Sequence, residues 1–99
     1  MSRNRSAAAV KWTEAAPVFA ALGDATRLRL VGRLCVDGPL SITRLSEGAG
    51  VTRQAVTKHL RVLANVGLAG GSQLGRESIW ELRPEPLEAA RRWLDGISA

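Results

Sequence analysis

The sequence predicts a small α+β domain that is mainly α-helical, with about five helices and a two-stranded β-hairpin. Three observations predict this class. Apolar residues recur at helical spacing along most of the chain, a glycine turn separates a short helical segment from a longer one, and segment 68–82 has strand-forming residues around a tight turn. The length of 99 residues is close to the commonest domain size, so we expect one domain.

Charge and composition narrow the class of partner. The chain has 14 Lys and Arg against 9 Asp and Glu, a net charge of +5, and such a surplus favours polyanions: DNA, RNA or an anionic membrane. The one cysteine, Cys35, cannot form an internal disulfide, which fits a reducing cytosol. No apolar run is long enough to span a bilayer. We therefore expect a cytoplasmic protein that does not act at a membrane.

The beginning of the chain predicts a tail followed by a helix. Residues 1–11 are small, polar and basic without an amphipathic period, so we expect a mobile tail before a domain at 12–99. Segment 12–23 predicts the first helix. Thr13 is a suitable N-cap, and Pro17 is tolerated only if it lies in the first turn.

Segment 24–38 predicts the second helix. Asp24 is a suitable N-cap, and Gly38-Pro39 ends the helix. Four residues at helical spacing form its apolar stripe: Leu28, Val31, Leu34 and Cys35. We therefore expect Cys35 to be a small buried thiol rather than a reactive or metal-binding one.

The next two segments predict a helix-turn-helix. Ser41 caps a short third helix, the GAG sequence at 48–50 forms a tight turn, and Thr52 caps a longer fourth helix within 51–68. Next, Ile79, Trp80 and Leu82 favour a strand, and Gly75-Arg76 suits a type II′ turn, so segment 68–82 predicts a hairpin.

Segment 83–99 predicts a fifth helix with a proline in its first turn. It carries an apolar stripe, with Trp93 beside it, formed by Leu87, Ala90, Leu94 and Ile97. This stripe is more apolar than a small monomer should leave exposed, which indicates a homodimer.

The fourth predicted helix separates its residue types sharply. At 100° per residue its apolar residues Val56, Leu60 and Leu63 cluster on one side. The opposite side carries residues that bind base edges and phosphates: Arg53, Gln54, Thr57, Lys58, Arg61 and Asn65. An ordinary solvated face usually includes Glu, but no acid lies between Glu47 and Glu77. The pattern therefore favours binding to DNA.

His59 falls on the inner side of the same helix. We expect it to be a packed or backbone-bonded histidine rather than a reader of bases.

Three stretches together resemble the ArsR-type winged helix-turn-helix repressors: ALGDATRLRLVGRL, LSITRLSEGAGVTRQAVTKHLRVLANVGLA and GRESIWEL. The similarity covers roughly residues 15–83. It implies a homodimeric repressor, autoregulatory in many relatives, that is joined through its first and fifth helices and binds an imperfect palindrome in double-stranded DNA. The residues it implies for DNA contact are Thr52, Arg53, Gln54, Thr57 and Lys58 on the fourth helix and Arg76 on the wing. The residues expected at the dimer interface are Trp12, Phe19, Trp93, Leu94 and Ile97.

The resemblance also bears on metals. Metal-sensing members of this family often carry a Cys-x-Cys pair where this chain has Ser41 and Thr43, and others use histidines on the last helix, where this chain has none. We therefore expect a member of the branch that does not sense metals, with no metal site and no cofactor. No residue pattern identifies an effector.

Other classes of function fit less well. The alternative is a winged-helix module for protein interaction without DNA binding, but such a module could carry acids on its fourth helix. An RNA reader would offer exposed aromatic residues, and this chain has four aromatics in all. One His, one Cys and no paired carboxylates or nucleophile motif argue against an enzyme.

Overall fold

The computed structural model describes residues 11–98, and the tail predicted at 1–11 lies outside this range except for Lys11. Within it the elements follow the order α2 (Trp12–Leu22), α3 (Ala25–Asp37), β1 (Leu40–Ser41), α4 (Ile42–Ser46), α5 (Arg53–Asn65), β2 (Ala69–Leu74), β3 (Glu77–Leu82) and α6 (Glu85–Ser98). The predicted class, mainly helical α+β with a winged helix-turn-helix, is confirmed.

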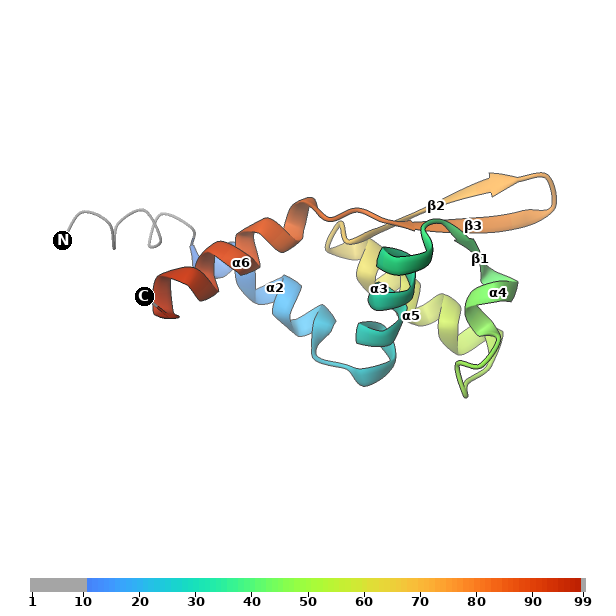
Figure 1. The fold of residues 1–99 in the computed structure, drawn as a ribbon, viewed down its shortest axis with the longest axis horizontal. Coiled ribbons are helices and arrows are strands. Elements are labelled where there is room, and N and C mark those ends of the chain that lie inside the picture. Colours follow the sequence, from blue (N-terminus) through green and yellow to red (C-terminus); the bar gives the residue numbers. More distant parts are fainter. Residues whose placement is uncertain (1–10, 99) are drawn as a thin grey trace.

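The elements form two ends (Figure 1). Helices α2 and α6 pack side by side at one end, and α3, α4 and α5 form the other, with the β2–β3 hairpin projecting along it. The first and last helices described, α2 and α6, therefore form a pair at one end of the molecule. The helix-turn-helix formed by α4 and α5 lies at the other end.

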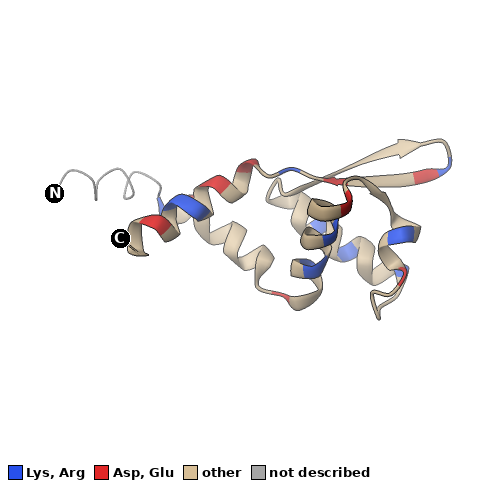
Figure 2. Ribbon diagram, in the orientation of Figure 1, with Lys and Arg blue, Asp and Glu red and all other residues tan. Residues whose placement is uncertain are grey.

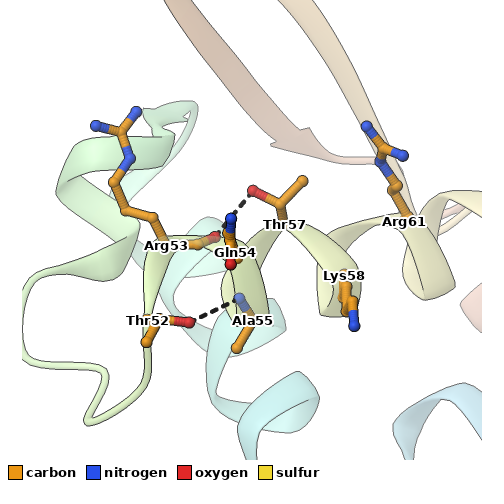
Figure 3. Close-up of a pocket in the computed structure, with 7 residues that line it drawn as sticks. All are labelled: Thr52, Arg53, Gln54, Ala55, Thr57, Lys58 and Arg61. Carbon is orange, nitrogen blue, oxygen red and sulfur yellow. Dashed lines mark hydrogen bonds between the residues drawn. The ribbon is translucent and has the colours of Figure 1, made fainter.

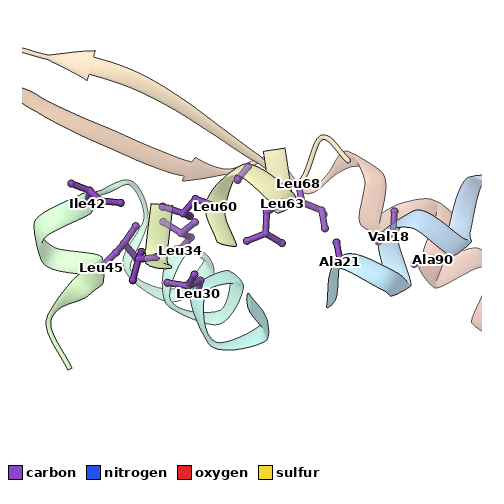
Figure 4. Packing of buried hydrophobic residues seen from close by; sticks show 12 residues of the cluster. Val18, Ala21, Leu30, Leu34, Ile42, Leu45, Leu60, Leu63, Leu68 and Ala90 are labelled. Atoms are coloured by element: carbon purple, nitrogen blue, oxygen red, sulfur yellow. The ribbon is translucent and has the colours of Figure 1, made fainter. Parts of the chain in front are cut away.

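The inner side of α5 lies at the centre of the core. Val56, Leu60 and Leu63 are fully buried, as their spacing predicts, and Leu45 of α4 and Leu68 after α5 are buried with them. Figure 4 shows how residues of α2 and α6 continue the same cluster: Val18, Ala21 and Ala90. Because apolar contacts surround one side of α5, its other side is left to face solvent.

All three predicted caps of the central helices are confirmed. The Asp24 carboxylate accepts a hydrogen bond of 2.9 Å from the backbone N–H of Arg27. The hydroxyl oxygens of Ser41 and Thr52 each accept one of 3.1 Å, from the third residue beyond. Each cap satisfies a backbone donor that has no partner inside its helix.

The predicted start of the first helix is wrong. Helix α2 begins at Trp12, its N-cap is Lys11 without a side-chain hydrogen bond, and Thr13 lies inside the helix. Pro17 is consequently the sixth residue, past the first turn, where it removes the hydrogen bond to the Thr13 carbonyl. Helix α2 nevertheless continues to Leu22, with Val18 and Ala21 buried in the core.

The predicted inner face of α3 is also partly wrong, because Cys35 is exposed and Leu28 is 55% exposed. The buried leucines are Leu30 and Leu34. Apolar residues occupy more of the circumference of α3 than one face, so their spacing alone does not select the inner one. The inner face is completed by Arg27, whose Nε donates a hydrogen bond to the carbonyl of Ala21.

The hairpin is confirmed, and the structure adds a short strand to it. The sheet order is β1-β3-β2, all antiparallel, with Leu40 opposite Trp80 and Ser41 opposite Ile79. Gly75 has a φ of +62°, which a type II′ turn requires at this position. The Trp80 ring lies so close to Gly71 across the ladder that a Cβ there would come within 3.1 Å of it. Because β1 pairs with β3 and leads directly into α4, it joins the base of the hairpin to the start of α4.

Candidate nucleic-acid interface

The outer side of α5 presents most of the predicted DNA-contact residues together. Arg53, Gln54, Lys58 and Arg61 are exposed, and Thr57 is half-buried. With Thr52 and Ala55 they line one open hollow of about 690 Å³ on the surface. In Figure 3, Arg53, Thr57 and Arg61 point to the same side at intervals of one turn, while Lys58 points to another. Seven residues are predicted to contact DNA, the six implied by the resemblance and Arg61 from the helical spacing, and all but Arg76 therefore belong to one surface. Asn65, which the spacing places on the same side, does not line this hollow.

The hydroxyl groups of Thr52 and Thr57 on this surface differ in the hydrogen bonds that they can still form. The Thr52 oxygen accepts the capping bond from Ala55, so its hydroxyl proton can still be donated. The Thr57 hydroxyl instead donates to the Arg53 carbonyl at 2.9 Å, so its oxygen and methyl group face outward. A hydroxyl donor suits a phosphate, and an acceptor beside a methyl group suits a base edge.

The cations of this surface are not neutralised. In the part of the chain that the structure describes, no hydrogen bond or ion pair engages the side chain of Arg53, Lys58 or Arg61. By contrast, three arginines outside α5 are paired with carboxylates: Arg33, Arg44 and Arg91. Figure 2 shows that α5 carries only basic charged residues, whereas α3 and α6 carry both signs. The outer side of α5 therefore offers positive charge to a polyanion.

The seventh predicted contact, Arg76, lies on the hairpin tip, away from the hollow on α5. A second hollow of about 370 Å³ runs between α5 and the sheet and is bordered by Arg61 and Trp80. It adds three polar residues that the sequence interpretation missed: Ser72, Gln73 and Ser78. Gln73 and Ser78 are cross-strand partners joined by a hydrogen bond of 3.3 Å, so knowledge of the register could have found them.

The predicted dimer residues lie at the opposite end of the molecule. Trp12, Leu94 and Ile97 are 65%, 46% and 66% exposed, and Phe19 and Trp93 are half-buried. They belong to α2 and α6, which lie side by side at the end of the molecule opposite α4 (Figure 1).

The charges beside this apolar surface are paired within α6. Arg91 binds Glu88 at 2.6 Å and Asp95 at 3.2 Å. The hydrogen bond from Arg91 lowers the pKa of Glu88, and the same bond raises the pKa of Arg91. This end of the molecule thus offers apolar side chains without unpaired charge from this triad.

His59 is packed against α3, as its inner position predicts. Its side chain is 23% exposed, and its Nδ1 lies 3.2 Å from Nη1 of Arg27 and 3.8 Å from the Asp24 carboxylate. The ring contacts these side chains and leaves the outer side of α5 to the residues named above.

Among residues 11–98, no three or more His, Cys, Asp and Glu side chains gather closely enough to hold a metal ion. None of the helices in this range has the length and apolar character needed to cross a membrane.

Comparison with known proteins identifies the same region. A family model described as a helix-turn-helix domain matches residues 22–69. The HTH-type transcriptional regulator NmtR of Mycobacterium tuberculosis is 39% identical over 83 residues, which cover 81% of this chain and 68% of that protein.

Solved structures agree with this match. A crystal structure of an ArsR family transcriptional regulator has a TM-score of 0.78 at 27% identity and covers 87% of this chain and 88% of its own. An ArsR-like transcriptional regulator from Rhodococcus sp. has a TM-score of 0.74 at 34% identity, covering 88% of this chain and 81% of its own.

Proposed function

Because the chain belongs to the ArsR-type winged helix-turn-helix family of transcriptional regulators, we propose that it is a cytoplasmic, homodimeric repressor of transcription. It binds an imperfectly palindromic operator in double-stranded DNA and acts on its own promoter. The observation that carries the proposal is the outer side of α5, which is exposed, rich in hydrogen-bonding side chains and free of acidic residues.

Helix α5 lies in the major groove with its N-terminal half against the bases. There Arg53 binds guanine, Gln54 binds adenine, and Thr57 contacts a thymine methyl or a base amino group. Lys58 assists these contacts, and Thr52 donates its free hydroxyl proton to a phosphate. Each of these roles uses hydrogen-bond donors or acceptors that the side chain does not already use within the folded protein.

The remaining contacts are to the DNA backbone. Arg61 binds a phosphate, together with Gln73 and Ser78 across the hollow between α5 and the sheet. Arg76 at the hairpin tip reaches the backbone or the minor groove beside the half-site. These contacts fix the position of the protein on the duplex and contribute little to the choice of sequence.

Dimerisation uses the α2–α6 end. Its exposed apolar residues Trp12, Leu94 and Ile97 meet those of a second copy, with Phe19 and Trp93 beside them. A two-fold dimer then presents two α5 helices, one to each half of the palindrome.

The test is to select bound sequences from a pool of random duplexes with the purified protein, and then to footprint the protein on its own promoter. We expect an enriched palindrome and two symmetrically protected half-sites. If no sequence is enriched and affinity is equal for all duplexes, sequence-specific repression is wrong. If no duplex is bound at all, the chain is the alternative, a winged-helix module for protein interaction.

A further inference from the structure

One arginine connects three helices. The Nε atom of Arg27, in the first turn of α3, donates a hydrogen bond to the Ala21 carbonyl of α2. The Nη1 atom of the same guanidinium lies 3.2 Å from Nδ1 of His59 in α5. In the part of the chain that is described, no other side-chain hydrogen bond joins α2 to another element. Arg27 is thus the polar connection between α2 and α5.

The chemistry of this connection defines the state of His59. A guanidinium group can only donate hydrogen bonds, so Nδ1 of His59 is the acceptor in this contact. Two charged groups face the ring: Arg27, and the Asp24 carboxylate at 3.8 Å, both from the start of α3. Within residues 11–98, no charged side chain of α2, α4 or the sheet lies within ion-pair distance of the ring.

Asp24 also stabilises the contact between Arg27 and His59. Its carboxylate accepts the backbone N–H of Arg27, which holds the helical turn from which the guanidinium extends. The partly buried position of His59, 23% exposed, shields its contact with Arg27 from water. Leucine packing beneath α5 is non-directional, whereas hydrogen bonds at these distances also define an orientation.

We propose that Arg27 and His59 are positioning residues that set the placement of α5 relative to α2. This inference rests on the proposed function, in which α2 forms part of the dimer interface and α5 reads DNA. A dimer accepts only half-sites whose separation matches that of its two recognition helices. The Arg27–His59 contact therefore determines which half-site spacing the dimer prefers.

The first test uses the operator selected by the wild-type protein, and the same operator with one base pair inserted between its half-sites. Wild type should prefer the original spacing. Arg27→Gln and His59→Leu should reduce this preference about tenfold, the effect of one hydrogen bond to a charged group. Their affinity for a duplex with a single half-site should not change. His59→Gln retains an acceptor and should preserve the preference.

The second test combines Arg27→Gln and His59→Leu in one chain. If the two side chains act through their mutual contact, the double variant should lose about as much spacing preference as either single variant. Losses that add in the double variant would contradict a shared role.

The third test needs no DNA. Spin labels at Ala16→Cys in α2 and Gln54→Cys in α5, in a Cys35→Ser background diluted with unlabelled chain, report the distance between the two helices. Arg27→Gln should broaden the distance distribution, and His59→Gln should not. Unchanged spacing preferences, or an unchanged distribution in a folded Arg27→Gln variant, would overturn the proposal. If wild type selects no duplex, the proposed function fails, and the label distances still decide this inference.

Discussion

The two ends of the molecule present opposite chemistry on helices of similar length. Helix α5 buries its leucines completely and presents arginine, lysine and glutamine side chains without ion-pair partners. Helix α6 presents leucine and isoleucine to solvent, while Arg91 pairs with acids of its own helix. In the first case the apolar side chains are buried within the chain, and the charged side chains are left for a partner. In the second, Arg91 has its partners inside the chain, and apolar side chains are left for a partner.

This difference indicates what each end can bind. Unpaired cations on a polar surface gain most from a polyanion, because neutralised phosphates release counterions. Exposed apolar side chains without unpaired charge gain most from another apolar surface. Single substitutions at either end test this difference.

The largest effect is expected at the apolar end. Leu94→Glu places a charge in the proposed dimer interface and should weaken self-association by about 2 kcal/mol or more, the scale of a central interface residue. Since one protomer contacts only one half-site, operator affinity should fall with it. Light scattering measures the mass, and Val36→Glu, at a site 84% exposed on α3, is the control that should remain dimeric. A wild-type protein that is monomeric at micromolar concentration would refute the interface.

The next effect is expected at the start of α5. Arg53→Ala should cost about 1–3 kcal/mol on the selected operator and little on scrambled duplex, because base contacts carry the discrimination. Titration of both duplexes with both proteins measures this. Arg92→Ala removes the same side chain from α6 and should change neither affinity. An equal loss on both duplexes would make Arg53 a phosphate contact.

A smaller and uniform effect is expected at Arg61. Arg61→Ala should weaken operator and scrambled duplex alike, and should reduce the slope of log affinity against log salt by about 1, one phosphate contact. The measurement is a salt series on both duplexes. A loss confined to the operator would assign Arg61 to the bases.

The smallest effect is expected between the two ends, at Asp24. Accepting the Arg27 backbone N–H lowers the pKa of Asp24 below its ordinary 3.8, and the charge of the Arg27 guanidinium acts in the same direction. A carboxyl with a lowered folded-state pKa stabilises the fold above its unfolded pKa and loses this contribution as the pH falls through the folded value. Asp24→Asn keeps a capping oxygen without the charge.

Denaturation of wild type and Asp24→Asn from pH 7 down to about pH 2 tests this sign. Wild type should be more stable at neutral pH, and the difference should disappear in acid. A difference that grows on acidification would show that the sign is wrong.

Much of the fold could be predicted from the sequence because its signals are local. Asp24, Ser41 and Thr52 cap their helices through residues three positions on, and the turn at Gly75 depends on one dihedral angle. The opposite sides of α5 also followed from periodicity. The interpretation failed at α3, where apolar residues occupy more than one face: Leu30 and Leu34 face the core together with Arg27, and Leu28 and Cys35 face solvent.

For the candidate site, the sequence predicted which α5 residues share a surface, and the structure places them together. The roles of these residues stay predictions. What the sequence could not provide was the polar border of the second hollow, because Gln73 and Ser78 belong to it only through the strand register and the way the sheet lies against α5. Strand β1 was missed because two residues are too few for any alternation to be read.

Ser41 joins two neighbouring structures by belonging to both. Its backbone lies opposite Ile79 in the β1–β3 pair, and its hydroxyl oxygen accepts the backbone N–H of Arg44 in the first turn of α4. Separating the β2–β3 hairpin from the rest of the domain would disrupt β1 and remove the N-cap of α4 at the same time. Wing root and α4 should therefore open as one cooperative unit in amide hydrogen exchange, with the hairpin tip exchanging separately and faster.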